Sequence, residues 1–396
     1  MLDTRSANDQ AKVATGRIVA LDRARTFTTL LVVIHHSVVN YTYFGNGDRI
    51  RWLGFDLVVL FNDSFFMAFM FLISGMFVHD SLTRRGAAGY LRHRAFRLGV
   101  PLLVSIFVMI PIAYYASFLR YHLPGTTDFN FFHYWWHMLI IGPWPSGQSW
   151  FLWVLLVFDV VAVAIWSMAP RLLAAFSQSL EALRQRPVAA FVAFSVFSVA
   201  CYLPMHLIFG DGAWFEPGHY PFPIQTSRIL LYPGYFLVGL GIGVVSLRAG
   251  LLAEGGPIAK RWPVWLGFAI LFYCVILLLV YAHHNWLADF ASPALWWRTA
   301  YGIAFALFSA AMAFTIPSTS LRLAKSSSLG LLDAMQPSAY GIYLLHYIFI
   351  IWLQYVVYDP AFPAGVKAAI VFAGTLGGSW VLTVLIRKIP FVARMI

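Results

Sequence analysis

Charged residues are scarce in this chain of 396 residues, because only 11% of them are Asp, Glu, Lys or Arg. A soluble domain usually contains about 25% charged residues. Here 60% of the residues are hydrophobic, and the mean hydropathy is +0.74. This composition excludes a water-soluble globule. Intrinsic disorder is excluded as well, since 17% of the residues are aromatic.

Cysteine is nearly absent too. Cys201 and Cys274 both fall in apolar runs, so they resemble small buried hydrophobic residues and do not indicate a redox compartment. The sequence contains no glycine-rich phosphate loop and no G-x-S-x-G elbow. The residues before Arg25 are polar, so we expect no cleaved signal peptide.

Apolar runs of about 20 residues recur along the chain and predict membrane-spanning helices. Helices are the expected form because the backbone must satisfy its own hydrogen bonds in lipid. The predicted fold class is an all-α polytopic membrane protein with about ten transmembrane helices. The expected spans are 26–44, 53–79, 98–119, 148–168, 187–208, 228–247, 262–283, 296–317, 339–357 and 364–386.

The basic residues predict how these spans are oriented. With both termini in the cytoplasm, 21 of the 27 Lys and Arg residues fall on the inner side, as the positive-inside rule requires. We therefore expect cytoplasmic tails at 1–25 and 387–396 around a single transmembrane domain at 26–386. The aromatic segment 129–142 is too short to cross and predicts an outer interfacial or re-entrant helix. No soluble catalytic domain is attached, so any active site lies within or between the helices.

The first span carries an unusual pair of ionisable residues, Arg25 at its inner end and His36 near its middle. Eleven residues of helix rise about 16 Å and nearly complete three turns, so the two side chains share one face. Ionisable groups in lipid are costly and mark function. Alternatively, Arg25 is only a topological anchor and His36 an interhelical hydrogen-bonding residue. The pair together favours a catalytic role for His36.

The second span adds Asp63 at a depth similar to that of His36. A carboxylate beside an imidazole can fix its tautomer and support its basicity, so Asp63 is a candidate catalytic partner. A polar contact between helices is the alternative. Ser74 is followed by Gly75, and this dipeptide also suits close helix packing.

A cluster of five arginines follows in segment 80–97, including Arg94 and Arg97 at i,i+3 spacing. Arginine clusters bind phosphates through paired hydrogen bonds, although topology signalling and contact with anionic lipids are alternatives. Asp159 interrupts the fourth span and His346 the ninth, at depths that allow the two to pair.

Other polar motifs are weaker. His133 and His137 have the i,i+4 spacing of metal ligands, but no Glu lies between them, and we expect an aromatic interfacial helix without metal. The glycosylation patterns at Asn40 and Asn62 fall in or against the bilayer and are interpreted as chance.

Several of these residues fall in one ordered set of motifs. Arg25 and His36 follow Leu21 and Asp22 in an L-D-x-x-R pattern, with ten residues between the Arg and the His. Four further pieces follow in order. They are Ser64, Phe65, Met67, Phe71, Ser74 and Gly75; Arg94, Arg97 and Pro101; Trp150, Phe151 and Leu152; and Tyr340, Ile342, Tyr343, Leu344, Leu345 and His346.

In these motifs the chain resembles the acyltransferase-3 family of bacterial integral membrane acyltransferases, over about residues 21–346. It looks most like the branch that contains the glucan succinyltransferases and related glycan-modifying proteins. The chain departs from the family pattern at four positions, where Phe66, Ala68, Gln148 and Ala339 replace His, Pro, His and Ser. The Arg25 and His36 pair is unaffected.

The resemblance implies an O-acyltransferase of the bacterial inner membrane that moves an acyl group from cytoplasmic acyl-CoA to a hydroxyl of an extracytoplasmic glycan. It implies His36 as the catalytic residue, either as general base or as an acyl-imidazole, with Asp63 beside it. For acyl-CoA it implies contacts from Arg25, Arg94, Arg97, Ser74 and His346. Trp144 and Trp150 are candidates for stacking against the acceptor sugar.

No permanently bound cofactor is expected, because acetyl-CoA or succinyl-CoA serves as donor substrate. The expected partners are acyl-CoA, a periplasmic or surface glycan and membrane lipids, but no nucleic acid, and a homodimer is left open. The competing interpretation is a polytopic transporter of an anionic solute without acyl-transfer chemistry. Transporters often have matched pairs of broken helices in two halves, and we find no such repeat.

Overall fold

The computed structural model describes residues 19–45, 47–121, 128–216, 218–245, 250, 252–253, 255–286, 293–323 and 330–396. Most of the predicted N-terminal tail and parts of the loops at 246–251, 287–292 and 324–329 lie outside these residues. The α-helices are α2 (Val19–Val38), α3 (Leu53–Asp63), α4 (Phe66–Met76), α5 (Val78–Arg94), α6 (Val100–Val104), α7 (Ile110–Tyr121), α8 (Phe131–Ile140), α9 (Trp150–Met168), α10 (Pro170–Ala182), α11 (Pro187–Phe209), α12 (Leu231–Val244), α13 (Pro257–Lys260), α14 (Trp262–Trp286), α15 (Leu295–Leu323), α16 (Leu331–Met335), α17 (Ala339–Val356), α18 (Ala364–Ile386) and α19 (Pro390–Met395).

Short elements connect these helices. The 3₁₀ helices are η1 (Val39–Tyr41), η4 (Gly147–Ser149), η5 (Thr226–Arg228) and η6 (Gln336–Ser338), and the π-helices are η2 (Ala95–Gly99) and η3 (Ser105–Met109). In the described part of the chain, the strands are limited to one antiparallel hairpin of β1 (Trp214–Phe215) and β2 (Ile224–Gln225). The prediction of an all-α polytopic membrane protein is confirmed.

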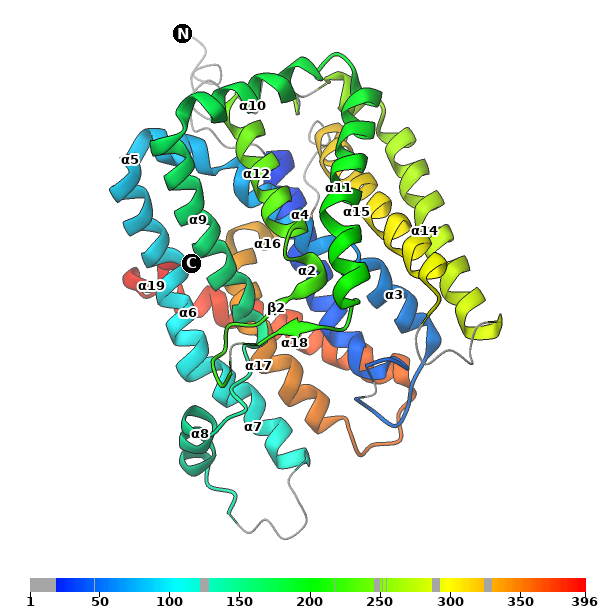
Figure 1. Cartoon of the computed structure of the whole chain (residues 1–396). Helices are drawn as coiled ribbons and strands as arrows, with labels where there is room; N and C mark the ends of the chain where they lie inside the picture. The colour runs from blue at the N-terminus through cyan, green and yellow to red at the C-terminus, as the bar shows by residue number, and fades with distance from the viewer. Residues whose placement is uncertain are drawn as a thin grey trace, which may run out of the picture.

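Nine helical segments of the described residues are long and apolar enough to cross a membrane. They correspond to the second to tenth predicted spans. Figure 1 shows α8 and α10 at opposite ends of the molecule, and α8 confirms the short helix expected within 129–142. The cytoplasmic placement of the termini stays a prediction.

The first predicted span, 26–44, has the wrong ends. Helix α2 begins at Val19 and ends at Val38, so it includes Asp22, Arg23 and Arg25 and is not among the nine apolar segments. These charges fit because the protein satisfies them: Arg23 Nε donates to Asp333 Oδ1 at 2.7 Å. In the same helix, the hydroxyls of Thr28 and Ser37 donate to backbone carbonyls four residues earlier.

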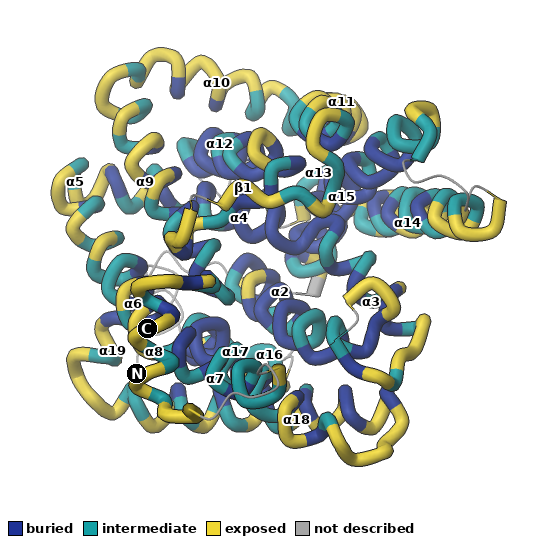
Figure 2. Tube along the Cα trace, turned by 60° about the horizontal axis from the view of Figure 1, so that its bottom comes forward, coloured by how far each residue is buried: buried dark blue, intermediate teal, exposed yellow. Residues whose placement is uncertain are grey.

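Helix α2 lies in the interior of the bundle, where it contacts α15, α17 and α18. In Figure 2 it is largely buried, whereas α10 and much of α14 are exposed on the outside. The two histidines near the end of α2 are therefore surrounded by other helices. This arrangement places a polar site inside the bundle.

Two prolines shape the long segment Val78–Tyr121, in which π-helices interrupt the α-helix. Proline has no N–H and leaves the carbonyl four residues before it without its usual partner. The carbonyl of Arg97, four residues before Pro101, accepts from the Tyr340 hydroxyl at 2.7 Å. The carbonyl of Phe107, four residues before Pro111, accepts from Trp135 Nε1 at 2.9 Å. Each freed carbonyl thus ties another helix to this segment, and the second one anchors α8.

Helices α4 and α12 pack with their backbones in direct contact. A Cβ atom added to Gly75 would lie 2.1 Å from the Phe236 carbonyl oxygen, and one added to Gly239 would lie 2.1 Å from that of Leu72. Gly243 makes the same kind of approach to the Met76 carbonyl, at 2.3 Å. No side chain fits between these helices, so the packing role considered for Ser74 and Gly75 is realised at Gly75.

Candidate active site

His36, near the end of α2, contacts helix α17. The ring centroid of His36 lies 5.4 Å from that of His346 and 5.2 Å from that of Tyr347. Gln354, further along α17, donates to the His36 carbonyl at 2.9 Å and accepts from Asn40 at 2.6 Å. Tyr347 and Gln354, seven residues apart, share one face of α17, and His346 lies beside it. This face holds the end of α2 in place.

The tautomer of His346 follows from its surroundings. Its Nδ1 lies 2.5 Å from the Tyr343 carbonyl oxygen, which can only accept a hydrogen bond. In the neutral ring Nδ1 therefore carries the proton, and Nε2 keeps its lone pair. Nε2 is buried without a hydrogen-bond partner. The ring beside His36 thus has a free proton-accepting nitrogen.

An aromatic chamber of about 740 Å³ opens next to His36. Its wall includes His36, Trp144, Trp150, Trp214, Tyr114 and Tyr347. Trp150 also contacts Trp214 edge to face, with ring centroids 6.0 Å apart. The structure therefore brings His36 together with both tryptophans that the sequence marked for the acceptor. Broad aromatic walls with a few polar groups are typical of small-molecule sites.

Two further cavities adjoin this chamber, because Tyr114 lines all three. A polar chamber of about 190 Å³ is lined by His36, Asn40, Arg120 and Gln354 among others. A third cavity of about 580 Å³ lies against α8 and includes His133 and His137. His133 Nδ1 lies 2.5 Å from Asp128 Oδ2, and this hydrogen bond lowers the pKa of the exposed Asp128 carboxyl. His36 stands where the aromatic and polar chambers meet.

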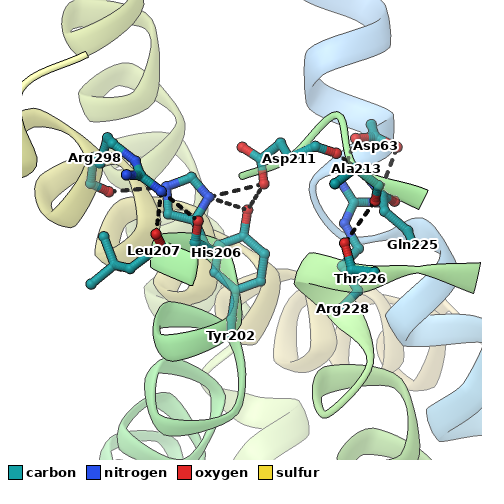
Figure 3. A network of polar contacts seen from close by, with 10 residues as sticks. All are labelled: Asp63, Tyr202, His206, Leu207, Asp211, Ala213, Gln225, Thr226, Arg228 and Arg298. Carbon is teal, nitrogen blue, oxygen red and sulfur yellow. Dashed lines mark hydrogen bonds and ion pairs between the residues drawn. The ribbon is translucent and has the colours of Figure 1, made fainter. Parts of the chain in front are cut away.

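Polar contacts fix the hairpin that carries Trp214, as Figure 3 shows. Asp211 accepts from the Tyr202 hydroxyl and lies 3.0 Å from His206 Nδ1. Thr226 donates to the Ala213 carbonyl at 2.9 Å, and Gln225 donates to the Asp211 carbonyl at 2.6 Å. Because the hairpin is attached to α11 at several points, the wall formed by Trp214 is held in position.

Asp63 is a candidate for orienting His36, but the hydrogen bonds of its carboxylate are formed with Arg228. Its two carboxylate oxygens accept from Arg228, with Nη1 to Oδ1 at 3.1 Å. The Arg228 side chain is only 3% exposed, and Asp63 is the carboxylate that neutralises it inside the bundle. His35 instead stacks on Phe66 at a centroid distance of 5.2 Å, at the position where the family pattern has His. The contact with Arg228 is the interhelical alternative considered for Asp63.

The arginines of the basic segment have different surroundings. Arg94 Nε lies 2.8 Å from Asp159 Oδ2, and the Tyr90 hydroxyl donates to Asp159 Oδ1 at 2.5 Å. Asp159 therefore does not form the pairing with His346 that the sequence left open. It could not be excluded from depth alone, because depth does not give the side of a helix.

Arg97 and Arg25 have weaker polar contacts than Arg94. Arg97 Nε donates to the Met395 carbonyl at 3.3 Å, and Arg97 is close enough to Arg25 and Arg94 for their charges to interact. Arg25 lies 3.4 Å from Asp22, and 47% of its side chain is exposed. Helix α2 is continuous from Arg25 to His36. The basic ends of α2 and α5 thus gather near one another.

Ser74 and the basic cluster lie apart from the three cavities, which Arg25, Arg94, Arg97 and Ser74 do not line. The Ser74 hydroxyl donates to the Met70 carbonyl of its own helix at 2.8 Å. His346 contacts His36 directly. Of the residues marked for acyl-CoA, His346 is therefore the one that the structure brings to His36.

A comparison with protein-family models identifies the family of this helical bundle. The model of the acyltransferase domain, Acyl_transf_3, matches residues 18–384. The chain belongs to the acyltransferase-3 family. It is therefore a multi-pass membrane acyltransferase. No significant match was found among curated proteins, and the glucan succinyltransferase branch stays a prediction.

Sequence reasoning missed several residues of this site. Tyr347 and Gln354 are seven residues apart on the ninth span, so their shared helix face next to His346 was a usable signal. Trp214 lies in a loop between two spans and Arg228 at the start of a span, where aromatic and basic residues are ordinary. Arg120 has the same ordinary appearance.

Proposed function

We propose that this acyltransferase moves an acyl group, acetyl or succinyl, from cytoplasmic acyl-CoA to a hydroxyl of an extracytoplasmic glycan in the bacterial inner membrane. His36 is the catalytic residue. The observation that carries this proposal is the position of His36, in the wall shared by an aromatic and a polar chamber and against the face of α17 that holds His346.

The chemistry needs a proton acceptor at the acceptor hydroxyl. In the general-base route, an imidazole nitrogen of His36 takes that proton while the hydroxyl oxygen attacks the thioester carbon. The carbon–sulfur bond breaks, and the proton passes to the departing thiolate to give CoA thiol. In the covalent route, His36 first attacks the thioester and forms an acyl-imidazole, and CoA leaves as the thiol. The acceptor hydroxyl then attacks the acyl-imidazole, takes the acyl group and releases the free imidazole. Both routes balance with the same donor and acceptor.

The acceptor is assigned to the aromatic chamber. Trp144, Trp150 and Trp214 offer flat apolar surfaces, and the adjoining tyrosines and Glu216 offer hydrogen-bonding groups. A sugar ring presents an apolar face and a rim of hydroxyls, so this combination suits it. In this arrangement a glycan hydroxyl reaches His36 from the outer side.

The donor is assigned to the basic ends of α2 and α5. Arg25 and Arg97 favour the phosphates of CoA, because guanidinium groups bind phosphate oxygens in pairs. Arg94 is a weaker candidate than the sequence indicated, since Asp159 already neutralises it. Helix α2 spans the distance between the phosphates at Arg25 and the thioester at His36, about 16 Å.

The test uses the purified protein in lipid nanodiscs with radiolabelled acetyl-CoA or succinyl-CoA and a β-glucan oligosaccharide. We expect mass spectrometry to detect acylated oligosaccharide with wild type and none with His36→Ala. Acylation by His36→Ala at the wild-type rate would overturn the assignment of His36. In proteoliposomes, passage of an anionic solute without any acylation would support the transporter interpretation instead.

A further inference from the structure

The polar chamber beside His36 differs in character from the aromatic one. Asn40, Arg120 and Gln354 face it together with the rings of Tyr114 and Tyr347. Gln354 is already bound to Asn40 and to the His36 carbonyl. The chamber therefore has a fixed amide wall next to the reactive imidazole, and Arg120 is its positively charged group.

Arg120 has partners, but none of them is an acid. Its Nη2 donates to the Gly47 carbonyl, and its guanidinium carbon lies 3.5 Å from the ring centroid of Tyr358. Its Nε is buried and has no hydrogen-bond partner among the residues that the structure describes. Among the described residues, no ion pair includes Arg120. A guanidinium that lines a cavity and has no carboxylate partner among the described residues is suited to an anionic ligand.

The neighbouring acid is already neutralised. Asp48 accepts from Lys367 Nζ at 3.2 and 3.1 Å, and both side chains are almost completely buried. A second arginine, Arg49, lies with its guanidinium carbon 5.5 Å from the Tyr358 ring centroid. Hydrogen bonds from Arg120 and Arg49 lower the pKa of the Tyr358 phenol. The surroundings of the polar chamber thus carry a surplus of positive charge.

We propose that the polar chamber binds a carboxylate of the substrate while the reacting carbonyl or hydroxyl of the same substrate lies at His36. Arg120 is the residue that selects for this negative charge. This inference rests on the proposed function. The carboxylate has two sources, the free end of a dicarboxylic acyl group or an acidic sugar of the acceptor. In either case it stays unchanged while the acyl group is transferred.

The small volume of the chamber, about 190 Å³, suits a short carboxylate-bearing arm rather than a sugar ring with its neighbours. Arg120 can recognise the negative charge of a substrate close to the reaction centre, because His36 and Arg120 line the same cavity. Hydrogen bonds to a charged group are stronger than those between neutral groups. An uncharged acyl arm of equal length gains nothing from them.

The test compares succinyl-CoA with butyryl-CoA, two donors of equal carbon number, on a neutral β-glucan oligosaccharide. We expect Arg120→Gln to lower the ratio of their kcat/KM values by about 10- to 100-fold. Arg49→Gln, which removes a charge near the same tyrosine but outside the chamber, is the matched control and keeps the wild-type ratio. An equal loss with both donors, or the same change in Arg49→Gln, overturns the proposal.

A second arm identifies the source of the carboxylate. Butyryl-CoA is paired with a glucuronate-containing oligosaccharide or with the neutral one, and a selective loss on the acidic acceptor in Arg120→Gln assigns the site to the acceptor. If Arg120→Gln does not fold, inhibition of wild type by succinate is compared with inhibition by uncharged succinamide, and equal inhibition overturns the proposal.

A third arm separates this inference from the proposed function. If wild type transfers no acyl group, greater thermal stabilisation by sodium succinate than by uncharged succinamide still supports the anion site, and equal stabilisation overturns it.

Discussion

The imidazole of His36 lies against that of His346, with ring centroids 5.4 Å apart and ring planes inclined at 33°. The two residues come from α2 and α17, at nearly opposite ends of the chain. Because the Tyr343 carbonyl fixes the proton on His346 Nδ1, its Nε2 is left as an acceptor. This pair forms the centre of the proposed site, and the predictions start from it.

We expect His36→Ala to lower acyl transfer by about 10²- to 10⁴-fold, the usual contribution of a general acid or base. The fold should persist, because α17 holds His36 by its backbone carbonyl rather than by its ring. His35→Phe is the matched control, since it keeps a ring to stack on Phe66. Transfer rates and thermal unfolding in detergent check both variants. Equal losses in the two would remove the distinction between neighbouring histidines.

His346→Gln should lower kcat by roughly 10- to 100-fold with little change in the KM of the acceptor. Gln can still donate to the Tyr343 carbonyl but lacks the accepting nitrogen, so the acidic limb of the pH–rate profile should change as well. A purely structural role would lower the yield of folded protein and leave the shape of that profile as in wild type.

Arg94 and Arg97 should behave differently despite their spacing. Arg94→Ala leaves Asp159, which is 0% exposed, without its cation. Breaking such a pair costs about 3–5 kcal/mol, so we expect a clear fall in the unfolding temperature. Arg97→Ala should fold normally and weaken CoA binding, measured by calorimetry. Arg94→Ala with wild-type stability but lost CoA binding would place Arg94 in the donor site instead.

Asp63→Asn separates the two roles considered for this carboxylate. It leaves the buried guanidinium of Arg228 unneutralised, so stability should fall by up to several kcal/mol. Combining it with Arg228→Gln should recover part of that loss, which thermal unfolding of the single and double variants measures. If Asp63→Asn keeps wild-type stability but loses transfer, Asp63 acts in the chemistry, as the sequence predicts.

Gly239→Val should prevent α4 and α12 from meeting, because its Cβ would lie 2.1 Å from the Leu72 carbonyl oxygen. We expect little or no folded protein in the membrane fraction. Gly267→Val on α14 is the control, since no atom lies within 4 Å of a Cβ added there. Detergent chromatography of the two variants checks the prediction. Equal recovery would show that the helices can separate.

The apolar runs predicted most of the fold, because long hydrophobic helices are the stable form of such sequences in lipid. The prediction failed at the start of α2, where Asp22, Arg23 and Arg25 looked like a helix boundary. Arg23 can lie within the helix because it pairs with Asp333, which is far away in the sequence. The hydropathy of a short segment cannot predict a contact with a residue so distant in the sequence.

The candidate site was only partly predictable for the same reason. His36 stands out because histidine in an apolar run is rare. Its proximity to His346, and the pairing of Asp63 with Arg228, depend on which helices are neighbours. Arg120 gave no signal, since one basic residue at the edge of a predicted span is ordinary. It became noticeable only through the cavity that it shares with His36.

The glycine contacts between α4 and α12 also limit how substrates can come and go. Two helices whose backbones touch cannot slide or part without losing all their contacts at once, so they act as a stationary wall. The ion pair of Asp63 and Arg228, just before these helices begin, fastens one edge of that wall. The cavities next to His36 are instead lined by residues of α7, α8 and α17, so we expect substrates to enter and leave on that side.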